Sequence, residues 1–260
     1  MHHFAALKAD GTRISVVTAY DYPTALAADA AGADAILVGD SLGMVALGYD
    51  STVPVTLEAM LHHTAAVRRG TRRAFLIADL PFLSYGICSK ASATNAGRLV
   101  KEAGAEAVKL EGGKAMAPTV EKIVSLGIPV LAHIGLLPQS VNQQGGYRVQ
   151  GRDASSAEVL LQDALAMQSA GAFAVVLEGI PADVAAKITS SLEIPTIGIG
   201  AGRHCDGQVL VLSDLLGMLP GRVPRFVRQY ANLNDQMTQA LKQFSTDVRE
   251  GRFPSEENEY

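Results

Sequence analysis

The feature that most limits the possible folds of this chain is a short phrase, Ala-Gly-Ala-Xaa-Ala, that occurs three times. It occupies residues 31–35, 103–107 and 170–174. In each copy an expected helix ends at the glycine, a residue suited to a left-handed cap, and an apolar segment of strand length begins at once. The repeat therefore indicates helices and strands that alternate on a parallel sheet. The unequal spacing of the copies argues against a solenoid.

Eight segments of strand length follow one another along the chain. We expect strands at 13–18, 36–38, 75–78, 108–110, 130–132, 175–177, 194–199 and 208–212. We expect helices at 4–8, 23–31, 56–69, 91–103, 115–126, 154–170 and 182–192. Eight strands with intervening helices are the number that closes a (β/α)8 barrel, the TIM barrel of the α/β class. A doubly wound open sheet is the competing architecture, but it needs fewer strands and usually a Gly-x-Gly-x-x-Gly segment after the first one, which is missing.

The chain length of 260 residues suits one such barrel, and we expect a single domain over 1–260. Segment 223–250 is typical of a long helix, so the barrel would carry extra C-terminal helices, and the polar tail 251–260 would be exposed. The connection 136–152 is rich in Gly and Gln. Connections of that length are usually functional or disordered.

Composition narrows the functional class. Hydrophobic residues make up 48% of the chain and charged residues 18%, which supplies a core and argues against disorder. A net charge of −4 without a basic run argues against a nucleic-acid partner. No apolar run is long enough to span a bilayer, and the two cysteines, Cys88 and Cys205, make no disulfide framework. We expect a cytoplasmic protein that acts on small molecules.

Five of the expected strands run into a side chain that can bind a metal ion or move a proton. These side chains are Asp40, Asp79, Glu111, His133 and Glu178. Because the carboxyl ends of all strands of a TIM barrel face the active site, we expect the five to converge. Carboxylates without paired cysteines favour Mg2+ or Mn2+ over zinc. Any one acid alone is more often a loop salt bridge or a helix cap, but five together indicate one shared site.

Several of these residues leave alternatives open. Lys109 lies two residues before Glu111 and shares its face of the strand, so it is suited to bind a substrate carboxylate, to form a Schiff base or to pair with a neighbouring acid. His133 fits a hydrogen-bond donor to substrate or a satisfied interior histidine. Glu178 lies farthest along the chain from the other acids and is the candidate general base. The glycine-rich segment 198–202 suits a phosphate-binding loop or close backbone packing.

Eight segments together resemble the ketopantoate hydroxymethyltransferase family. They are 18–22 (TAYDY), 38–44 (VGDSLGM), 63–70 (HTAAVRRG), 78–82 (ADLPF), 108–113 (VKLEGG), 138–142 (PQSVN), 145–152 (GGYRVQGR) and 197–202 (IGIGAG). The matches occur in order along the chain. The resemblance implies a (β/α)8 barrel that uses Mg2+ and 5,10-methylenetetrahydrofolate in pantothenate synthesis.

The same resemblance implies a role for each site residue. Asp40, Asp79 and Glu111 would surround Mg2+, with Glu111 acting through water. The residues in contact with the 2-oxo acid substrate would be Asp40, Ser41, Asp79, Lys109 and His133. Lys109 thereby becomes a binder of the substrate carboxylate rather than a Schiff-base lysine, and Glu178 becomes the base.

The implied reaction transfers a hydroxymethyl group from 5,10-methylenetetrahydrofolate to 3-methyl-2-oxobutanoate and gives 2-dehydropantoate. Mg2+ bound to the keto and carboxylate oxygens would place positive charge where an enolate oxygen develops while Glu178 removes the C3 proton. Two other functions stay open: a Mg2+-dependent 2-oxo acid lyase or mutase on a related barrel, and a catalytically silent barrel that serves as a binding subunit. The chain lacks the Lys-Lys-Cys-Gly-His segment of such lyases.

The chain departs from the family pattern in two places. The leader before Arg13 is short, which leaves open how the bottom of the barrel is closed. Asn258 stands where the tail of the family often has histidine, a difference that touches no residue of the expected site. Because family members commonly assemble as decamers, the resemblance also implies a homo-oligomer.

Overall fold

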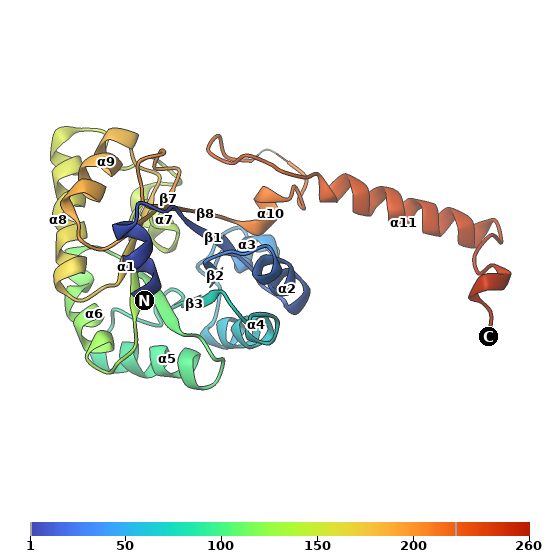
Figure 1. Ribbon diagram of the computed structural model, residues 1–260, viewed down its shortest axis with the longest axis horizontal. Helices are drawn as coiled ribbons and strands as arrows, with labels where there is room; N and C mark the ends of the chain where they lie inside the picture. The colour runs from blue at the N-terminus through green and yellow to red at the C-terminus, as the bar shows by residue number, and fades with distance from the viewer. Residues whose placement is uncertain (1, 222) are drawn as a thin grey trace. The chain divides into compact units, whose positions relative to one another are not determined.

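The computed structural model describes residues 2–221 and 223–260, and its chain forms two compact units, Met1–Val211 and Leu212–Tyr260. The first unit contains eight parallel strands that pair in sequence order from β1 to β8 and close into a barrel, because β8 also pairs with β1 (Figure 1). This confirms the expected (β/α)8 barrel and excludes the open sheet. The organisation of residues 1–260 as a single domain stays a prediction.

The barrel strands and the helices between them occur where the sequence predicts them, with bounds that differ by a few residues. The strands are β1 (Ile14–Thr18), β2 (Ala35–Val38), β3 (Phe75–Asp79), β4 (Ala107–Glu111), β5 (Val130–Gly135), β6 (Ala174–Glu178), β7 (Thr196–Ile199) and β8 (Gly207–Leu210). The longer helices that follow them are α2 (Tyr22–Ala30), α4 (Leu57–Gly70), α5 (Ser89–Lys101), α6 (Ala117–Val124), α8 (Ala154–Ser169) and α9 (Ala182–Ser191). These helices surround the barrel in Figure 1.

The three copies of the repeated phrase have the backbone conformation expected of them. Gly32, Gly104 and Gly171 adopt φ angles of 87°, 78° and 91°. Residues with a side chain rarely adopt this left-handed region, so glycine ends the helix and allows the chain to turn directly into the next strand. The repeat thus fixes the short connections into β2, β4 and β6.

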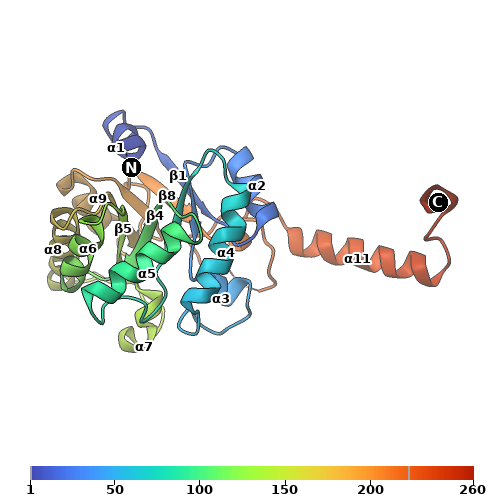
Figure 2. The same ribbon diagram turned by 90° about the horizontal axis from the view of Figure 1, so that it is seen from below.

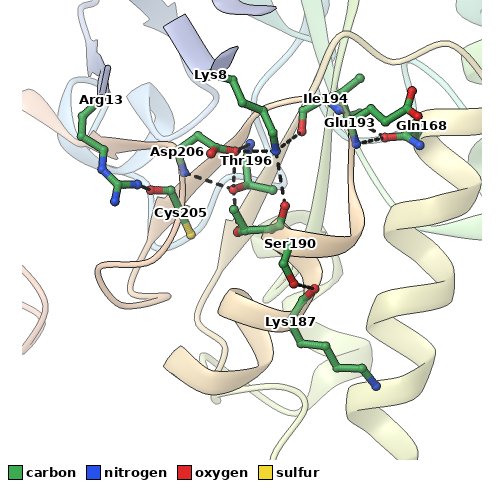
Figure 3. Close-up of polar contacts among 11 residues, drawn as sticks. Lys8, Arg13, Gln168, Lys187, Ser190, Glu193, Ile194, Thr196, Cys205 and Asp206 are labelled. Atoms are coloured by element: carbon green, nitrogen blue, oxygen red, sulfur yellow. Dashed lines mark hydrogen bonds and ion pairs between the residues drawn. The ribbon is translucent and has the colours of Figure 1, made fainter. Parts of the chain in front are cut away.

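A helix at the N-terminus closes one end of the barrel. In α1 (His2–Ala9), the ring of Phe4 is 1% exposed and packs edge-on against Phe173, at a centroid distance of 5.4 Å. Lys8 Nζ donates hydrogen bonds to the Thr189 and Ile194 carbonyls, at 3.3 and 3.1 Å, and pairs with Asp206 Oδ2 at 3.0 Å (Figure 3). The short leader is therefore long enough to cover the barrel bottom.

The opposite end of the barrel carries short helical segments. Figure 2 shows α1 at one end and both α3 (Leu42–Val45) and α7 (Val141–Gln144) at the other. The long connection 136–152 is ordered around the 3-10 turn η2 (Pro138–Ser140) and α7. This is the end where the carboxyl termini of the strands meet, and it is the end at which TIM-barrel sites lie.

The second unit contains α10 (Leu212–Leu215), α11 (Leu233–Arg249) and the turn η3 (Glu256–Asn258). The expectation of a helix over 223–250 is wrong for its first ten residues. The backbone N–H of Tyr230 donates to the Leu215 carbonyl at 2.8 Å, so this stretch bonds to an earlier segment rather than to itself. The helix begins only after Asn232, whose side chain accepts a hydrogen bond from the Asp235 N–H at 3.4 Å. No helix within 2–221 or 223–260 is long and apolar enough to cross a membrane.

Candidate active site

The interior face of the barrel changes from apolar to ionisable near the carboxyl ends of four neighbouring strands. Alternate residues of a strand share one face. The residue two positions after an apolar residue of the barrel interior therefore also faces the interior, one layer closer to the carboxyl end of the strand. The interior pairs are Ile77 below Asp79, Ala107 below Lys109 and Glu111, Leu131 below His133, and Val176 below Glu178. The strand register sets Asp79 beside Lys109 and Glu111 beside His133. The structure thus brings together the strand-end residues that the sequence predicts.

Lys109 and Asp79 form a buried ion pair at the centre of this cluster. Lys109 Nζ lies 2.8 Å from Asp79 Oδ1, and the two residues are 5% and 1% exposed. Burial by itself lowers the pKa of Lys109, but the negative charges of Asp79, Glu111 and Asp40 outweigh it and raise the pKa. A Schiff-base lysine must react as a neutral amine. The geometry therefore favours a lysine that stays charged, suited to a substrate carboxylate, and argues against a Schiff base.

Two further acids, Asp40 and Glu111, lie close to this ion pair. The backbone N–H of Asp40 donates to Asp79 Oδ2 at 3.0 Å, and Asp40 is 4% exposed. Burial and then the charge of Asp79 raise the pKa of Asp40 to about 7. Burial also raises the pKa of Glu111, with the charge of Asp40 adding to it against the opposing charge of Lys109. The cluster therefore contains more carboxyl groups than the single charge of Lys109 can compensate when all are ionised.

His133 lies between two carboxylates. Its Nε2 atom is 3.2 Å from Glu178 Oε2 and its Nδ1 atom is 3.6 Å from Glu111 Oε1. Neither approach has the alignment of a hydrogen bond within the described chain, although both nitrogens are buried. Burial lowers the pKa of His133 despite the neighbouring charge of Glu178, so the ring is neutral near pH 7. A neutral imidazole with an unsatisfied N–H in a polar site is suited to donate to a bound oxygen, the first of the two alternatives for this residue.

Glu178 and Ser41 are more accessible than the buried acids. The Glu178 side chain is 18% exposed, so it reaches the open end of the site. Ser41 Oγ lies 2.8 Å from the hydroxyl of Tyr20, which is 8% exposed. A Cβ atom at Gly39 would lie 2.9 Å from Ser41 Oγ and 3.5 Å from Asp79 Oδ2, so only glycine lets β2 end this close to both residues.

The donor set of the cluster fits Mg2+ by its chemistry. Buried carboxylates with raised pKa values would be stabilised by a divalent cation, and Mg2+ commonly takes only one or two protein carboxylates besides water and substrate oxygens. As the side chains lie, no three His, Cys, Asp or Glu residues within the described ranges form a complete metal-binding group. In this arrangement Asp79 is bonded to Lys109, while Asp40 and Glu111 each have one oxygen bonded to Gln139.

Three residues close to the site lie outside the predicted set. Gln139 is 5% exposed and contacts two of the acids, and the hydroxyl of Tyr85 donates to its side chain at 2.7 Å. Tyr147 lies on the connection 136–152, and its hydroxyl contacts Met44 Sδ at 3.6 Å. Burial and then the charge of Asp40 raise the pKa of Tyr147, which indicates that this connection lies near the acids. Gln139 and Tyr147 belong to segments of the family resemblance, but their residue types gave no signal of a role.

The glycine-rich segment 198–202 is closely packed. A Cβ atom at Gly198 would lie 2.9 Å from Cys205 Sγ and 3.0 Å from Gln208 Nε2. Gln208 Nε2 also donates a hydrogen bond to the Gly202 carbonyl at 3.0 Å. These contacts favour the packing interpretation of this segment over a phosphate-binding loop.

Two solved structures of similar fold carry the names of other enzymes. A phosphonopyruvate hydrolase complex with oxalate and Mg2+ matches with a TM-score of 0.63 and 14% identity, over 98% of this chain and 92% of that one. A 2,3-dimethylmalate lyase of the PEP mutase/isocitrate lyase superfamily matches with a TM-score of 0.61 and 17% identity, over 100% and 90%. Likeness at this level of identity concerns the barrel fold alone.

Sequence comparison identifies much nearer relatives. The chain is 57% identical over 254 residues to a 3-methyl-2-oxobutanoate hydroxymethyltransferase of Carboxydothermus hydrogenoformans, which covers 98% of this chain and 92% of that protein. It is 57% identical over 255 residues to the enzyme of the same name from Moorella thermoacetica. This match covers 98% of this chain and 95% of that protein. The sequence profile described as ketopantoate hydroxymethyltransferase matches residues 1–256, almost the whole length. The chain belongs to the ketopantoate hydroxymethyltransferase family.

Proposed function

We propose that this protein is a 3-methyl-2-oxobutanoate hydroxymethyltransferase. It transfers the one-carbon unit of 5,10-methylenetetrahydrofolate to 3-methyl-2-oxobutanoate and forms 2-dehydropantoate, also called ketopantoate, for pantothenate biosynthesis. The structural observation that carries the proposal is the row of ionisable side chains on the interior face of β3 to β6, above an apolar floor. The high identity to enzymes of that name supports it independently.

The charged side chain of Lys109 and its neighbours bind the carboxylate end of the substrate. Lys109 stays charged because three acids surround it, so it attracts the carboxylate of the 2-oxo acid. The Ser41 hydroxyl, held by Tyr20, adds a neutral donor close by. Asp40 and Asp79 lie near the keto end, and His133 offers an N–H to a substrate oxygen. These contacts orient the substrate before any bond changes.

Asp40, Asp79 and Glu111 would hold Mg2+, with Glu111 acting through water. A bound Mg2+ supplies positive charge beside the keto oxygen and so makes the C3 proton more acidic. Glu178 accepts this proton, because it is the acid of the cluster with an open approach from the barrel mouth. Carbon C3 and the oxygen of a water molecule then form bonds to the one-carbon unit, and the bonds from this unit to both folate nitrogens break. The two nitrogens take up the proton lost from C3 and one proton of the water, which leaves tetrahydrofolate.

We further propose that the protein acts as a homo-oligomer, a decamer by the family resemblance, in the cytoplasm. Along α11, the apolar residues Met237, Leu241, Phe244 and Val248 recur at the spacing of one helix face. All four are exposed. A second copy of the chain is the partner that we propose for this stripe. The two cysteines are unpaired thiols, as suits a reducing compartment.

A product assay tests the proposed reaction against its alternatives. The purified protein is incubated with 3-methyl-2-oxobutanoate, 5,10-methylenetetrahydrofolate and Mg2+, and 2-dehydropantoate and tetrahydrofolate are measured by mass spectrometry. We expect the two products in equal amounts, and none when the folate is omitted. Turnover of 2-oxo acids without folate would support a lyase or mutase instead. A folded chain with no turnover would support a silent barrel.

A further inference from the structure

One buried amide side chain connects two acids of the site. Gln139 lies in η2, directly after β5, and its Nε2 atom donates to Asp40 Oδ2 at 2.8 Å. Its backbone N–H donates to Glu111 Oε2 at 3.0 Å. Asp40 follows β2 and Glu111 ends β4, so a single residue holds carboxylates that come from separate strands. Gln139 belongs to the segment 138–142 of the family resemblance, to which the proposed reaction assigns no role.

The network around Gln139 leaves only one orientation for its amide. The Glu111 N–H donates to the Tyr85 hydroxyl oxygen at 3.0 Å, and the Tyr85 hydroxyl in turn lies 2.7 Å from Gln139 Oε1. The Tyr85 proton is therefore directed to the amide oxygen. Gln139 Nε2 also donates to the Leu80 carbonyl at 3.0 Å, which only accepts. If the amide were turned round, its oxygen would face a carbonyl and a carboxylate, and both contacts would be repulsive.

The same network holds the two acids in fixed directions. Both protons of Gln139 Nε2 are used, one on Asp40 and one on Leu80, so the amide is not free to rotate. The Asp40 carboxylate is bonded through Oδ2, and its backbone N–H is bonded to Asp79. Glu111 is bonded through Oε2. One oxygen of each acid is therefore occupied by Gln139, and a carboxylate held in this way presents its remaining oxygen in one direction.

We propose that Gln139 is a positioning residue, which orients the carboxylates of Asp40 and Glu111 toward a divalent cation and the 2-oxo acid, and that the Tyr85 hydroxyl holds its amide in place. This inference rests on the proposed function, because it assigns the two acids to the cation and its substrate. The contacts of Gln139 are with the acids and with the residues that hold its amide. It acts through the direction of the acids, and its loss leaves them free to turn.

Calorimetric titration with Mg2+ tests this role without turnover. The full chain is titrated in the presence of saturating 3-methyl-2-oxobutanoate and no folate, as wild type and as Gln139→Leu, which keeps most of the side-chain volume but removes both ends of the amide. Loss of a group that orients ligating carboxylates typically weakens metal affinity about 10- to 100-fold, and we expect a rise of this size in the Mg2+ Kd. Tyr85→Phe keeps Gln139 and removes only the hydrogen bond to its amide oxygen, and we expect a smaller rise in the same direction.

Gln144→Leu is the matched control. Gln144 is a glutamine of the same connection, and among the described residues its side chain bonds to backbone groups alone. It accepts from the Leu137 N–H at 3.1 Å and donates to the Gly135 carbonyl at 3.2 Å. We expect it to leave the Mg2+ Kd near the wild-type value. Equal weakening by Gln144→Leu and Gln139→Leu would overturn the proposal, because the connection as a whole would then be responsible.

Two further outcomes separate this proposal from the proposed function. If wild type binds Mg2+ and Gln139→Leu, shown by circular dichroism to be folded, binds it equally well, the positioning role is wrong while the proposed reaction stands. If wild type binds no Mg2+ under these conditions, the assignment of the acids to a cation is wrong, and the positioning role is overturned with it.

Discussion

Lys109 Nζ lies 2.8 Å from Asp79 Oδ1 inside the barrel, and neither residue is more than 5% exposed. Two strands meet in this contact, since β3 and β4 pair with Asp79 directly beside Lys109. Taking both charges out of water is costly, so the pair adds little to stability as a whole, but the loss of either partner leaves a buried charge without compensation. A substitution of either residue therefore changes both the stability of the barrel and the net charge of the site.

Replacement of Lys109 therefore affects both stability and function. We expect Lys109→Met to lower the free energy of unfolding by about 3–5 kcal/mol, the usual effect of breaking a buried ion pair. Urea denaturation measures this loss. Lys187→Met is the control, because Lys187 pairs with Glu158 at 3.2 Å on the surface and its loss should have little effect. Equal effects of the two substitutions would contradict the buried pair.

Asp29 connects α2 to the segment before β3 and makes stability depend on pH. Its Oδ1 atom accepts from the backbone N–H groups of Arg73 and Ala74, both at 2.8 Å. Burial by itself raises the pKa of Asp29, but these hydrogen bonds outweigh it and lower the pKa. A lowered pKa in the folded state adds stability above the unfolded value of about 3.9, and this contribution is lost as pH falls through the folded value.

The Asp29→Asn variant isolates this contribution. We expect it to be less stable than wild type at pH 6, with a difference that shrinks as the pH is lowered toward 3. The unfolded wild-type chain takes up a proton at Asp29 near its unfolded pKa of about 3.9, before the folded chain does, and this favours unfolding of wild type. Thermal unfolding followed by circular dichroism between these two pH values measures the trend. A difference that stays constant over this range would show that Asp29 does not titrate with folding.

The two thiols should differ sharply in reactivity. Cys205 is buried, and burial raises its pKa, whereas Cys88 is exposed before α5. Only the thiolate attacks a disulfide reagent. We expect one fast-reacting thiol in the native protein, two after unfolding, and no fast thiol in Cys88→Ser. Fast reaction of the Cys88→Ser variant would show that Cys205 is accessible.

The apolar stripe of α11 should decide self-association. Leu241→Asp places a charge in the middle of the stripe, and we expect it to reduce the oligomer mass seen by light scattering, because burying an uncompensated charge opposes association. Gln239→Asp adds the same carboxylate to the same helix but off the stripe, and it should keep the wild-type mass. An unchanged mass for Leu241→Asp would rule out this stripe as the contact.

The barrel and most of its site were predictable from sequence for a physical reason. Buried parallel strands are short apolar runs, and an ionisable residue that ends such a run lies at the mouth of the barrel. This argument correctly brought Asp79, Glu111, His133 and Glu178 together. The position of Lys109 follows from the same period of two residues. Because Lys109 lies two residues before Glu111 on β4, it faces the interior if Glu111 does.

Other features were beyond the sequence because they depend on contacts between distant segments. Gln139 and Tyr85 meet across the barrel mouth from different connections, and no spacing along the chain records their hydrogen bond. The residues before Asn232 have the composition of a helix, but Tyr230 bonds to Leu215 instead. Tertiary hydrogen bonds overrode local propensity in this second unit.

Exchange of the C3 proton of 3-methyl-2-oxobutanoate tests the central claim most directly. The protein is incubated with this substrate and Mg2+ in D2O, with tetrahydrofolate either present or absent, and the C3 proton is followed by NMR. We expect exchange by wild type that stops when EDTA removes the metal, and exchange at least about 100-fold slower in Glu178→Gln, in line with the usual contribution of a general base. Exchange by Glu178→Gln at the wild-type rate would contradict the assignment of the base. The absence of exchange by wild type under both conditions would contradict proton removal from this substrate altogether.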